Sequence, residues 1–306
     1  MARAQIPRRI VVLSYAPPEE ESVRRTLRAF REGLEAESLA EGRDYAVEVI
    51  HAPLGEGLPR RVREALKREP ELLVALTTPV AQAVARETRA VPIVFGIVSD
   101  PVGSGLVASL PRPGGNVTGI SNMLPALSGK VLELLLELIP GAARVAVLWN
   151  PDNPAKLLEL QELRAAARTR GVALRELPAR SAPEIETALA GAAAERVHAL
   201  LILAETLTNN HRRRIAELSL ASRLPVVANN LLPIEAGGLA SYAPDYTELS
   251  RRMGAQAAKI LRGTKPSELP VELPAKFQLA VNLKTARTLG LTVPRPVLLR
   301  ADKVIE

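Results

Sequence analysis

Short apolar segments alternate with amphipathic helical patterns along almost the whole chain, and this alternation constrains the fold more than any other feature. The first apolar segment, Arg9–Ser14, is followed by a stretch whose apolar residues share one helical face, Val23, Leu27, Phe30 and Leu34. Strands that alternate with helices are typical of parallel sheets joined by crossover helices. The pattern therefore predicts an α/β protein.

The alternation occurs twice, and a chain of 306 residues is long enough for two domains with separate cores. The first set closes with the strand Val91–Val98. The second opens with a helix that ends at Ile139, for which Ser128 is a suitable N-cap. A strand, a long helix and a further strand then follow the second set, as expected if the chain passes between two lobes several times. The predicted joints lie near Gly119–Leu127, near Ala243–Asp245 and in Gly263–Pro274.

Composition narrows the chemistry that the chain can carry out. There is no cysteine, which excludes disulfides, thiolate metal sites and cysteine nucleophiles. The three histidines, His51, His198 and His211, are far apart, so neither metal binding nor acid–base catalysis is indicated. The net charge is +7, but aromatic residues make up only 3% of the chain, which disfavours nucleic-acid binding by base stacking.

One glycine-rich segment matches a nucleotide-binding pattern only in part. Gly103–Ala108 reads G-x-G-x-x-A after a strand, but Asp100-Pro101 separates the strand from the glycines. The acidic residue expected about twenty positions later is missing, because Asn116 to Ser121 stand there. We therefore interpret the segment as a turn, and we expect no cofactor, no resident metal and no catalysis.

Polar residues follow the predicted strands of both sets at the point where each strand ends. Open α/β sheets bind ligands at the carboxyl ends of their strands. A helix that begins there can hold an anion with its free N–H groups, as the helix after Thr77-Thr78 could. Each residue could equally serve as a cap or turn, but six such ends in two sheets form a stronger pattern. The candidates are Ser14 and Tyr15, Thr77 and Thr78, Ser99 and Asp100 in the first set, and Trp149 and Asn150, Glu205, Asn229 and Asn230 in the second.

Two longer motifs carry a resemblance to a known family. Ser99–Leu110 contains D-P-V-G-x-G-L, and Pro113–Gly119 reads P-G-G-N-V-T-G. With Val145–Pro151, Lys259–Gly263 and Asn282–Ala286, these segments resemble ABC transporter substrate-binding proteins, a family that includes binders of tryptophan, phenylalanine and tyrosine. The similarity extends over nearly the whole chain.

The resemblance implies a type I periplasmic binding fold, with two Rossmann-like lobes, a three-segment hinge and a solute site in the cleft between the lobes. It places 8–120 with 243–266 in lobe 1, and 121–242 with 267–306 in lobe 2. It also implies a protein that works in the periplasm or outside the cell, after removal of a signal peptide or on a membrane anchor. Such a protein is expected to be a monomer that binds a small polar solute and delivers it to a membrane permease.

The resemblance also suggests roles for residues at the strand ends. Thr77, Thr78, Ser99, Asp100, Trp149, Asn150 and Asp245 are the pocket candidates that it carries over. In this hypothesis Thr77 and Thr78 hold an anionic group, Asp245 or Glu205 holds an amine, and Trp149 stacks on a ring. The pair Asn229-Asn230 and the proline at 244 depart from the amino-acid-binding branch, so the solute is left open as an amino acid, aromatic or otherwise.

Two other functions fit the same fold. The effector domain of a sugar-type repressor would need a DNA-binding helix-turn-helix, and only eight residues precede Arg9. An enzyme built on a doubly wound sheet would need a nucleophile with its base or a cofactor loop, and the sequence presents neither pattern. Both alternatives are therefore disfavoured.

Overall fold

The computed structural model describes residues 6–53 and 55–306, and it divides into two compact units. Unit 1 comprises Met1–Met123 and Asp245–Lys276, and unit 2 comprises Leu124–Pro244 and Phe277–Glu306. The chain therefore passes from one unit to the other three times. The predicted α/β class with two sheets of mainly parallel strands is confirmed.

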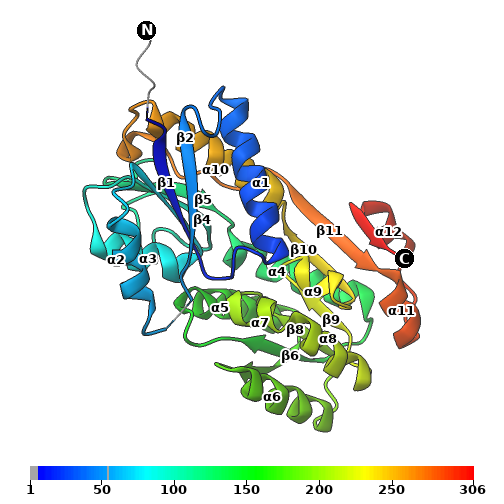
Figure 1. The fold of residues 1–306 in the computed structure, drawn as a ribbon. Helices are drawn as coiled ribbons and strands as arrows, with labels where there is room; N and C mark the ends of the chain where they lie inside the picture. Colours follow the sequence, from blue (N-terminus) through cyan, green and yellow to red (C-terminus); the bar gives the residue numbers. More distant parts are fainter. Residues whose placement is uncertain (1–5, 54) are drawn as a thin grey trace. The chain divides into compact units, whose positions relative to one another are not determined.

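Unit 1 is built on a five-stranded parallel sheet with the order β2-β1-β3-β4-β5 (Figure 1). Its strands are β1 (Arg8–Ser14), β2 (Tyr45–His51), β3 (Leu72–Leu76), β4 (Ile93–Val98) and β5 (Val117–Ser121). Its helices are α1 (Glu21–Ala36), α2 (Leu58–Leu66), α3 (Thr78–Glu87), α10 (Tyr246–Leu261) and the short 3₁₀ helix η1 (Pro266–Glu268).

Successive residues of β1 enter two separate cores. Ile10 and Val12 pack with α1 and α10 on one face of the sheet, whereas Val11 and Leu13 pack with α2 and α3 on the other. Because adjacent side chains of a strand point to opposite faces, a strand that is covered on both sides must be apolar throughout. This burial explains the continuous apolar run in β1.

Unit 2 has a seven-stranded sheet with the order β12-β11-β10-β9-β8-β6-β7. Strands β6 to β10 run parallel, β11 is antiparallel to β10, and β12 is parallel to β11. The strands are β6 (Arg144–Trp149), β7 (Ala173–Pro178), β8 (Ala199–Ile202), β9 (Val226–Ala228), β10 (Ala240–Pro244), β11 (Phe277–Asn282) and β12 (Lys303–Ile305).

The helices of unit 2 cover its sheet in the same way. Val145 and Val147 of β6 face the core formed with α4 and α5, while Ala146 and Leu148 face α6, α8 and α9. The helices are α4 (Leu124–Leu138), α5 (Pro154–Thr169), α6 (Ala182–Ala194), α7 (Thr206–Asn210), α8 (Arg212–Ala221), α9 (Leu232–Glu235), α11 (Leu283–Leu289) and α12 (Arg295–Arg300). Helix α4 begins at Leu124, so Ser128 lies inside it and does not cap it; its hydroxyl donates to the Glu159 carbonyl at 3.2 Å.

The division into units differs from the predicted lobes at the third crossing. We expected residues 267–276 in lobe 2, but they pack with unit 1. The Thr118 hydroxyl donates to the Leu269 carbonyl at 2.7 Å, and the Glu272 N–H donates to the Gly119 carbonyl at 3.0 Å. These bonds hold the segment against β5, so the chain leaves unit 1 only after Lys276. The other two boundaries lie within three residues of those expected.

Helix α10 returns to unit 1 and packs directly on α1. A Cβ atom at Gly254 of α10 would overlap the carbonyl oxygen of Phe30, and one at Gly33 of α1 would overlap that of Arg251. The two glycines therefore permit the backbones to approach more closely than any side chain would allow. The third segment of the chain is thus an integral part of the unit 1 core.

Candidate functional site

The carboxyl ends of β1, β3 and β4 bring the unit 1 candidates to one edge of the sheet. These strands are neighbours and parallel, so Ser14-Tyr15, Thr77-Thr78 and Ser99-Asp100 all follow strands that end at the same edge. Thr77 and Thr78 also stand where α3 begins. The predicted grouping of these residues is therefore present within unit 1.

The backbone at this edge adopts conformations that L-residues with branched side chains avoid. Thr77 has φ 91° and ψ 155°, and Ile97 of β4 has φ 60°. The Thr77 N–H donates to the Gly96 carbonyl at 2.9 Å, beside the register shift between Phe95 and Val98. Such conformations cost on the order of 1–3 kcal/mol each and are found where function requires a particular geometry.

The other unit 1 candidates make mostly local contacts. The Asp100 carboxylate accepts from the Gly103 N–H at 2.8 Å and so closes the turn Asp100–Gly103, which leads into the glycine-rich segment. Ser14 is buried, and its Oγ lies 3.4 Å from the Ala16 N–H. The Ser99 carbonyl accepts from the Ser121 hydroxyl at 3.3 Å. Asp100 and Ser14 therefore have evident structural roles at the edge.

In unit 2, the candidates lie at the carboxyl ends of the neighbouring strands β6, β8 and β9. Trp149 ends β6 and packs partly buried against the core under α4 and α5. Asn150 follows it, and its Oδ1 accepts from the Asp152 N–H at 3.0 Å. Asn230 stands one residue before Leu231, the N-cap of α9, and its Oδ1 accepts from the Leu232 N–H at 2.8 Å.

Glu205 is the most deeply buried carboxylate among the predicted candidates, with 7% of its surface exposed. It caps α7, because Oε1 accepts from the N–H groups of Leu207 and Thr208 at 2.7 and 3.3 Å. Burial raises the pKa of Glu205, and the charge of Lys156 opposes this rise. The Asn150 side chain also favours the ionised form, although no hydrogen bond of ordinary geometry from the described residues reaches Oε2.

Beneath Glu205 lies a buried polar network that the sequence did not reveal. The Lys156 Nζ lies 2.5 Å from Glu159 Oε1 and donates to the Ala204 carbonyl at 2.9 Å. Asn229 donates to Glu159 Oε2 and accepts from the Ala204 N–H, both at 2.9 Å. Both polar atoms of the Asn229 amide are thus engaged within the unit, and a direct contact between Asn229 and a ligand stays a prediction.

A sequence signal for this network does exist. Five buried residues of α5 are spaced by 3, 1, 3 and 4 positions and so lie on one helix face: Lys156, Glu159, Leu160, Leu163 and Ala167. A lysine and a glutamate on an apolar face must be paired if they are to be buried. This buried pair was not predicted from the sequence, because most pairs of oppositely charged residues in the chain are exposed to solvent.

Asp245 lies at the second crossing and caps α10. Its Oδ1 accepts from the N–H groups of Thr247 and Glu248, both at 3.1 Å. These bonds are those of an ordinary helix N-cap. Asp245 is therefore the N-cap of α10, and its predicted role in binding an amine stays a prediction.

Five buried side-chain atoms on these two edges have no hydrogen-bond partner among residues 6–53 and 55–306; we call them the orphan atoms. Two are in unit 1, on Thr77 and on Asn122, whose N–H donates to the Val98 carbonyl. Three are in unit 2, on Trp149, Glu205 and Asn209 of α7. Asn122 and Asn209 were not predicted. The atoms are Thr77 Oγ1, Asn122 Oδ1, Trp149 Nε1, Glu205 Oε2 and Asn209 Oδ1.

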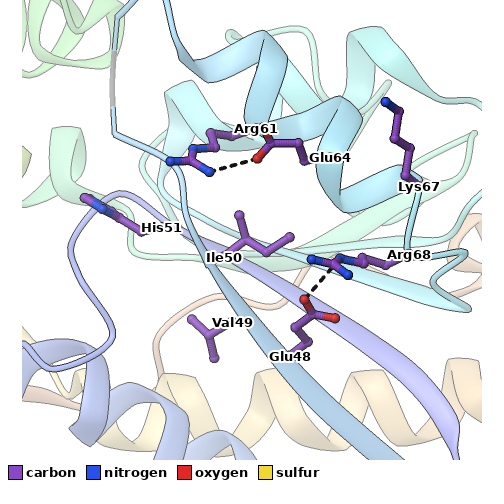
Figure 2. Close-up of a pocket in the computed structure, with 8 residues that line it drawn as sticks. All are labelled: Glu48, Val49, Ile50, His51, Arg61, Glu64, Lys67 and Arg68. Carbon is purple, nitrogen blue, oxygen red and sulfur yellow. Dashed lines mark hydrogen bonds and ion pairs between the residues drawn. The ribbon is translucent and has the colours of Figure 1, made fainter.

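A separate surface pocket of about 480 Å³ lies between β2 and α2 of unit 1 (Figure 2). Four of its charged residues are already paired, because Arg61 contacts Glu64 at 2.8 Å and Arg68 contacts Glu48 at 3.2 Å. Its eight lining residues include none of the predicted candidates. We therefore assign the candidate site to the strand edges and not to this pocket.

Metal-binding groups and membrane-spanning helices are both absent from the described part of the chain. No group of three or more His, Asp or Glu side chains within it could hold a metal ion. Within the same residues, no helix is both long and apolar enough to cross a membrane.

Comparison with known proteins relates the chain to a family. The chain is 27% identical over 221 residues to a tyrosine-binding protein of Clostridioides difficile, which is 72% of this chain and 63% of that relative's length. A domain from Streptococcus pneumoniae solved in complex with L-Trp superposes with a TM-score of 0.89 at 25% identity, covering 98% of this chain and all of that one. A conserved domain protein from Vibrio cholerae gives 0.91 at 27% identity with the same coverage.

The family model for ABC transporter substrate-binding proteins matches residues 14–305. The match includes every strand end described above, and the solved relatives share the two-lobed α/β fold. The resemblance seen in the sequence motifs is thereby confirmed. The chain belongs to the family of ABC transporter substrate-binding proteins.

Proposed function

We propose that the protein binds an aromatic amino acid, for which Glu205 holds the ammonium group. Membership of the family makes the chain an extracytoplasmic solute-binding component that works with a transporter permease. The tyrosine-binding relative and the L-Trp complex support an aromatic solute.

The orphan atoms carry this proposal. Buried polar groups in folded proteins almost always have a partner, because an unmet hydrogen bond costs about 1–3 kcal/mol. Two such atoms lie at the carboxyl edge of the unit 1 sheet and three at that of the unit 2 sheet, and open α/β sheets bind ligands at these edges. A solute with an ammonium group would supply the donors that Glu205 Oε2 and Asn209 Oδ1 lack.

Glu205 is the better candidate than Asp245 for the ammonium. Glu205 is buried and one oxygen is an orphan atom, whereas Asp245 is only partly buried and caps a long helix. A charge-assisted hydrogen bond is strongest where water is excluded. The N-terminus of α3, at Thr77 and Thr78, is the corresponding candidate for the carboxylate of the solute.

Calorimetric titration with L-tyrosine, L-phenylalanine and L-tryptophan tests the proposal. We expect at least one to bind with micromolar affinity, equivalent to about −8 kcal/mol. Glu205→Gln should weaken that binding roughly ten- to hundred-fold, as expected for loss of one charged partner. Glu217→Gln, at an exposed position of α8, is the matched control and should leave affinity unchanged. Equal affinities for wild type and Glu205→Gln would rule out Glu205 as the ammonium partner.

We further propose that binding is reversible, without chemical change of the solute, and that the protein acts as a monomer that does not bind nucleic acid. Family membership and the nature of the relatives support a carrier role. Recovery of the solute intact after prolonged incubation and a monomer mass in light scattering are the expected results. Chemical conversion of the solute that occurs only in the presence of the folded protein would contradict the carrier role.

A further inference from the structure

Ala204, the residue that precedes Glu205, is held through both its N–H and its carbonyl group by the buried network of unit 2. The Ala204 N–H donates to Asn229 Oδ1 at 2.9 Å, and the Ala204 carbonyl accepts from Lys156 Nζ at 2.9 Å. The two bonds come from different elements and restrain the two successive planar peptide groups on either side of the Ala204 Cα, so together they restrict the backbone of Ala204 and the direction in which the chain enters the next residue. That next residue is Glu205.

Glu159 closes the network into a ring. Its Oε1 binds Lys156 and its Oε2 binds Asn229, at 2.5 and 2.9 Å. The exposed fractions of Lys156, Glu159 and Asn229 are 2%, 0% and 1%. The ring therefore joins α5, the end of β8 and the end of β9 through contacts that water does not reach, and such contacts are stronger for their low-dielectric surroundings.

Helix α7 cannot hold Glu205 in place by itself. It has five residues, which is far below the length at which a helix is stable alone. Glu205 caps this helix, so the orientation of its carboxylate and the first turn of α7 depend on the same backbone. The restraint must come from outside α7, and the ring supplies it.

We infer that Lys156, Glu159 and Asn229 are positioning residues that orient the Glu205 carboxylate for the solute. The inference rests on the proposed function in so far as Glu205 meets the ammonium. Stability alone does not account for the ring, because a buried ion pair often contributes no more to stability than an apolar replacement of the same volume. The positive charge of Lys156 also opposes the rise in the Glu205 pKa that burial causes, which helps to keep the carboxylate ionised.

The test uses Asn229→Ala, with Asn282→Ala as its matched control. Both residues are buried asparagines of unit 2 with one side-chain donor bond and one acceptor bond. Asn282 ends β11, which is antiparallel to β10, so it lies at the opposite edge of the sheet. The two variants lose the same kind of contacts, but only Asn229 belongs to the ring.

Amide hydrogen exchange provides a readout that needs no solute. In Asn229→Ala the Leu207 and Thr208 amides, which Glu205 caps, should exchange about ten-fold faster than in Asn282→Ala. Unchanged exchange at these two amides would overturn the positioning role, whatever the protein binds.

Titration separates positioning from general destabilisation. Asn229→Ala should weaken L-tyrosine binding roughly ten-fold but leave 3-(4-hydroxyphenyl)propionate, which lacks the ammonium, unaffected. In a Glu205→Gln background the same substitution should have no further effect on L-tyrosine. Equal losses for both compounds would overturn the inference. If wild type binds L-tyrosine and Glu205→Gln does not weaken it, the proposed function fails, while exchange at Leu207 and Thr208 still decides the positioning role.

Discussion

The two carboxyl edges belong to similar sheets but place their polar groups by different means. In unit 1, the polar groups are placed by the backbone itself, because Thr77 and Ile97 have positive φ and the pairing of β4 with β5 shifts in register. In unit 2, the polar groups are held by side chains, namely the buried ring of Lys156, Glu159 and Asn229. One edge depends on local conformational strain, and the other depends on long-range electrostatics. The same architecture can thus prepare a binding edge by two separate physical routes.

The largest effect should come from breaking the ring of unit 2. Lys156→Met leaves Glu159 buried without its cation, so we expect the free energy of unfolding to fall by about 3–5 kcal/mol. Urea denaturation followed by emission of Trp149, the single tryptophan, reports unit 2 directly. Arg164→Met, which breaks the half-exposed pair with Glu176, is the control and should cost at most about 1 kcal/mol. Similar losses for the two variants would mean that the ring is not a strong electrostatic unit.

The next effect tests how far unit 1 depends on close backbone contact. Gly254→Ala forces α10 away from Phe30 of α1, and such overpacking costs about 1–3 kcal/mol. Amide exchange in α1 should accelerate accordingly. Gly191→Ala, in α6 where a Cβ atom meets nothing within 4 Å, should be neutral or stabilising by about 0.5–1 kcal/mol. A Gly254→Ala variant as stable as wild type would show that the helices can separate at no cost.

A smaller effect of opposite sign is expected at Thr77. Thr77→Gly removes the strain of φ 91° at the cost of a more flexible unfolded chain, so unit 1 should gain about 1 kcal/mol. Solute affinity should fall, because the side chain at the start of α3 is lost. Thr88→Gly, at the other end of α3 in extended backbone, should instead be destabilising. Loss of stability in Thr77→Gly would show that the hydroxyl matters more than the strain.

The smallest effect is a pH dependence in unit 2. The folded pKa of Glu205 is raised by burial, so its contribution to stability is complete below the ordinary pKa of a glutamate and is lost as pH rises through the folded value. Relative to Glu205→Gln, wild type without solute should therefore lose stability as the pH rises above the ordinary pKa of a glutamate. Denaturation midpoints across this range check the slope, with Glu217→Gln as control. Parallel curves for wild type and Glu205→Gln would contradict the raised pKa.

The residues at the carboxyl edges could be predicted from the sequence, because the residues that follow parallel strands all lie at the same edge of the sheet. Ser14, Thr77, Trp149 and Glu205 were found in this way. The ring was missed because Lys156 and Glu159 look like a surface pair until the tertiary packing of α5 is known. The backbone of Thr77 was missed because nothing in a threonine indicates positive φ; the surrounding sheet imposes it.

The return of α10 to unit 1 has a consequence for the order of synthesis. The N-terminal segment that ends at Met123 contains all five strands of the unit 1 sheet, but the apolar face of α1 is covered only when Tyr246–Leu261 has been made. The ribosome must therefore synthesise the whole of Leu124–Pro244 before the core of unit 1 can be completed. Domains generally fold as units while the chain emerges, and here the N-terminal one must wait.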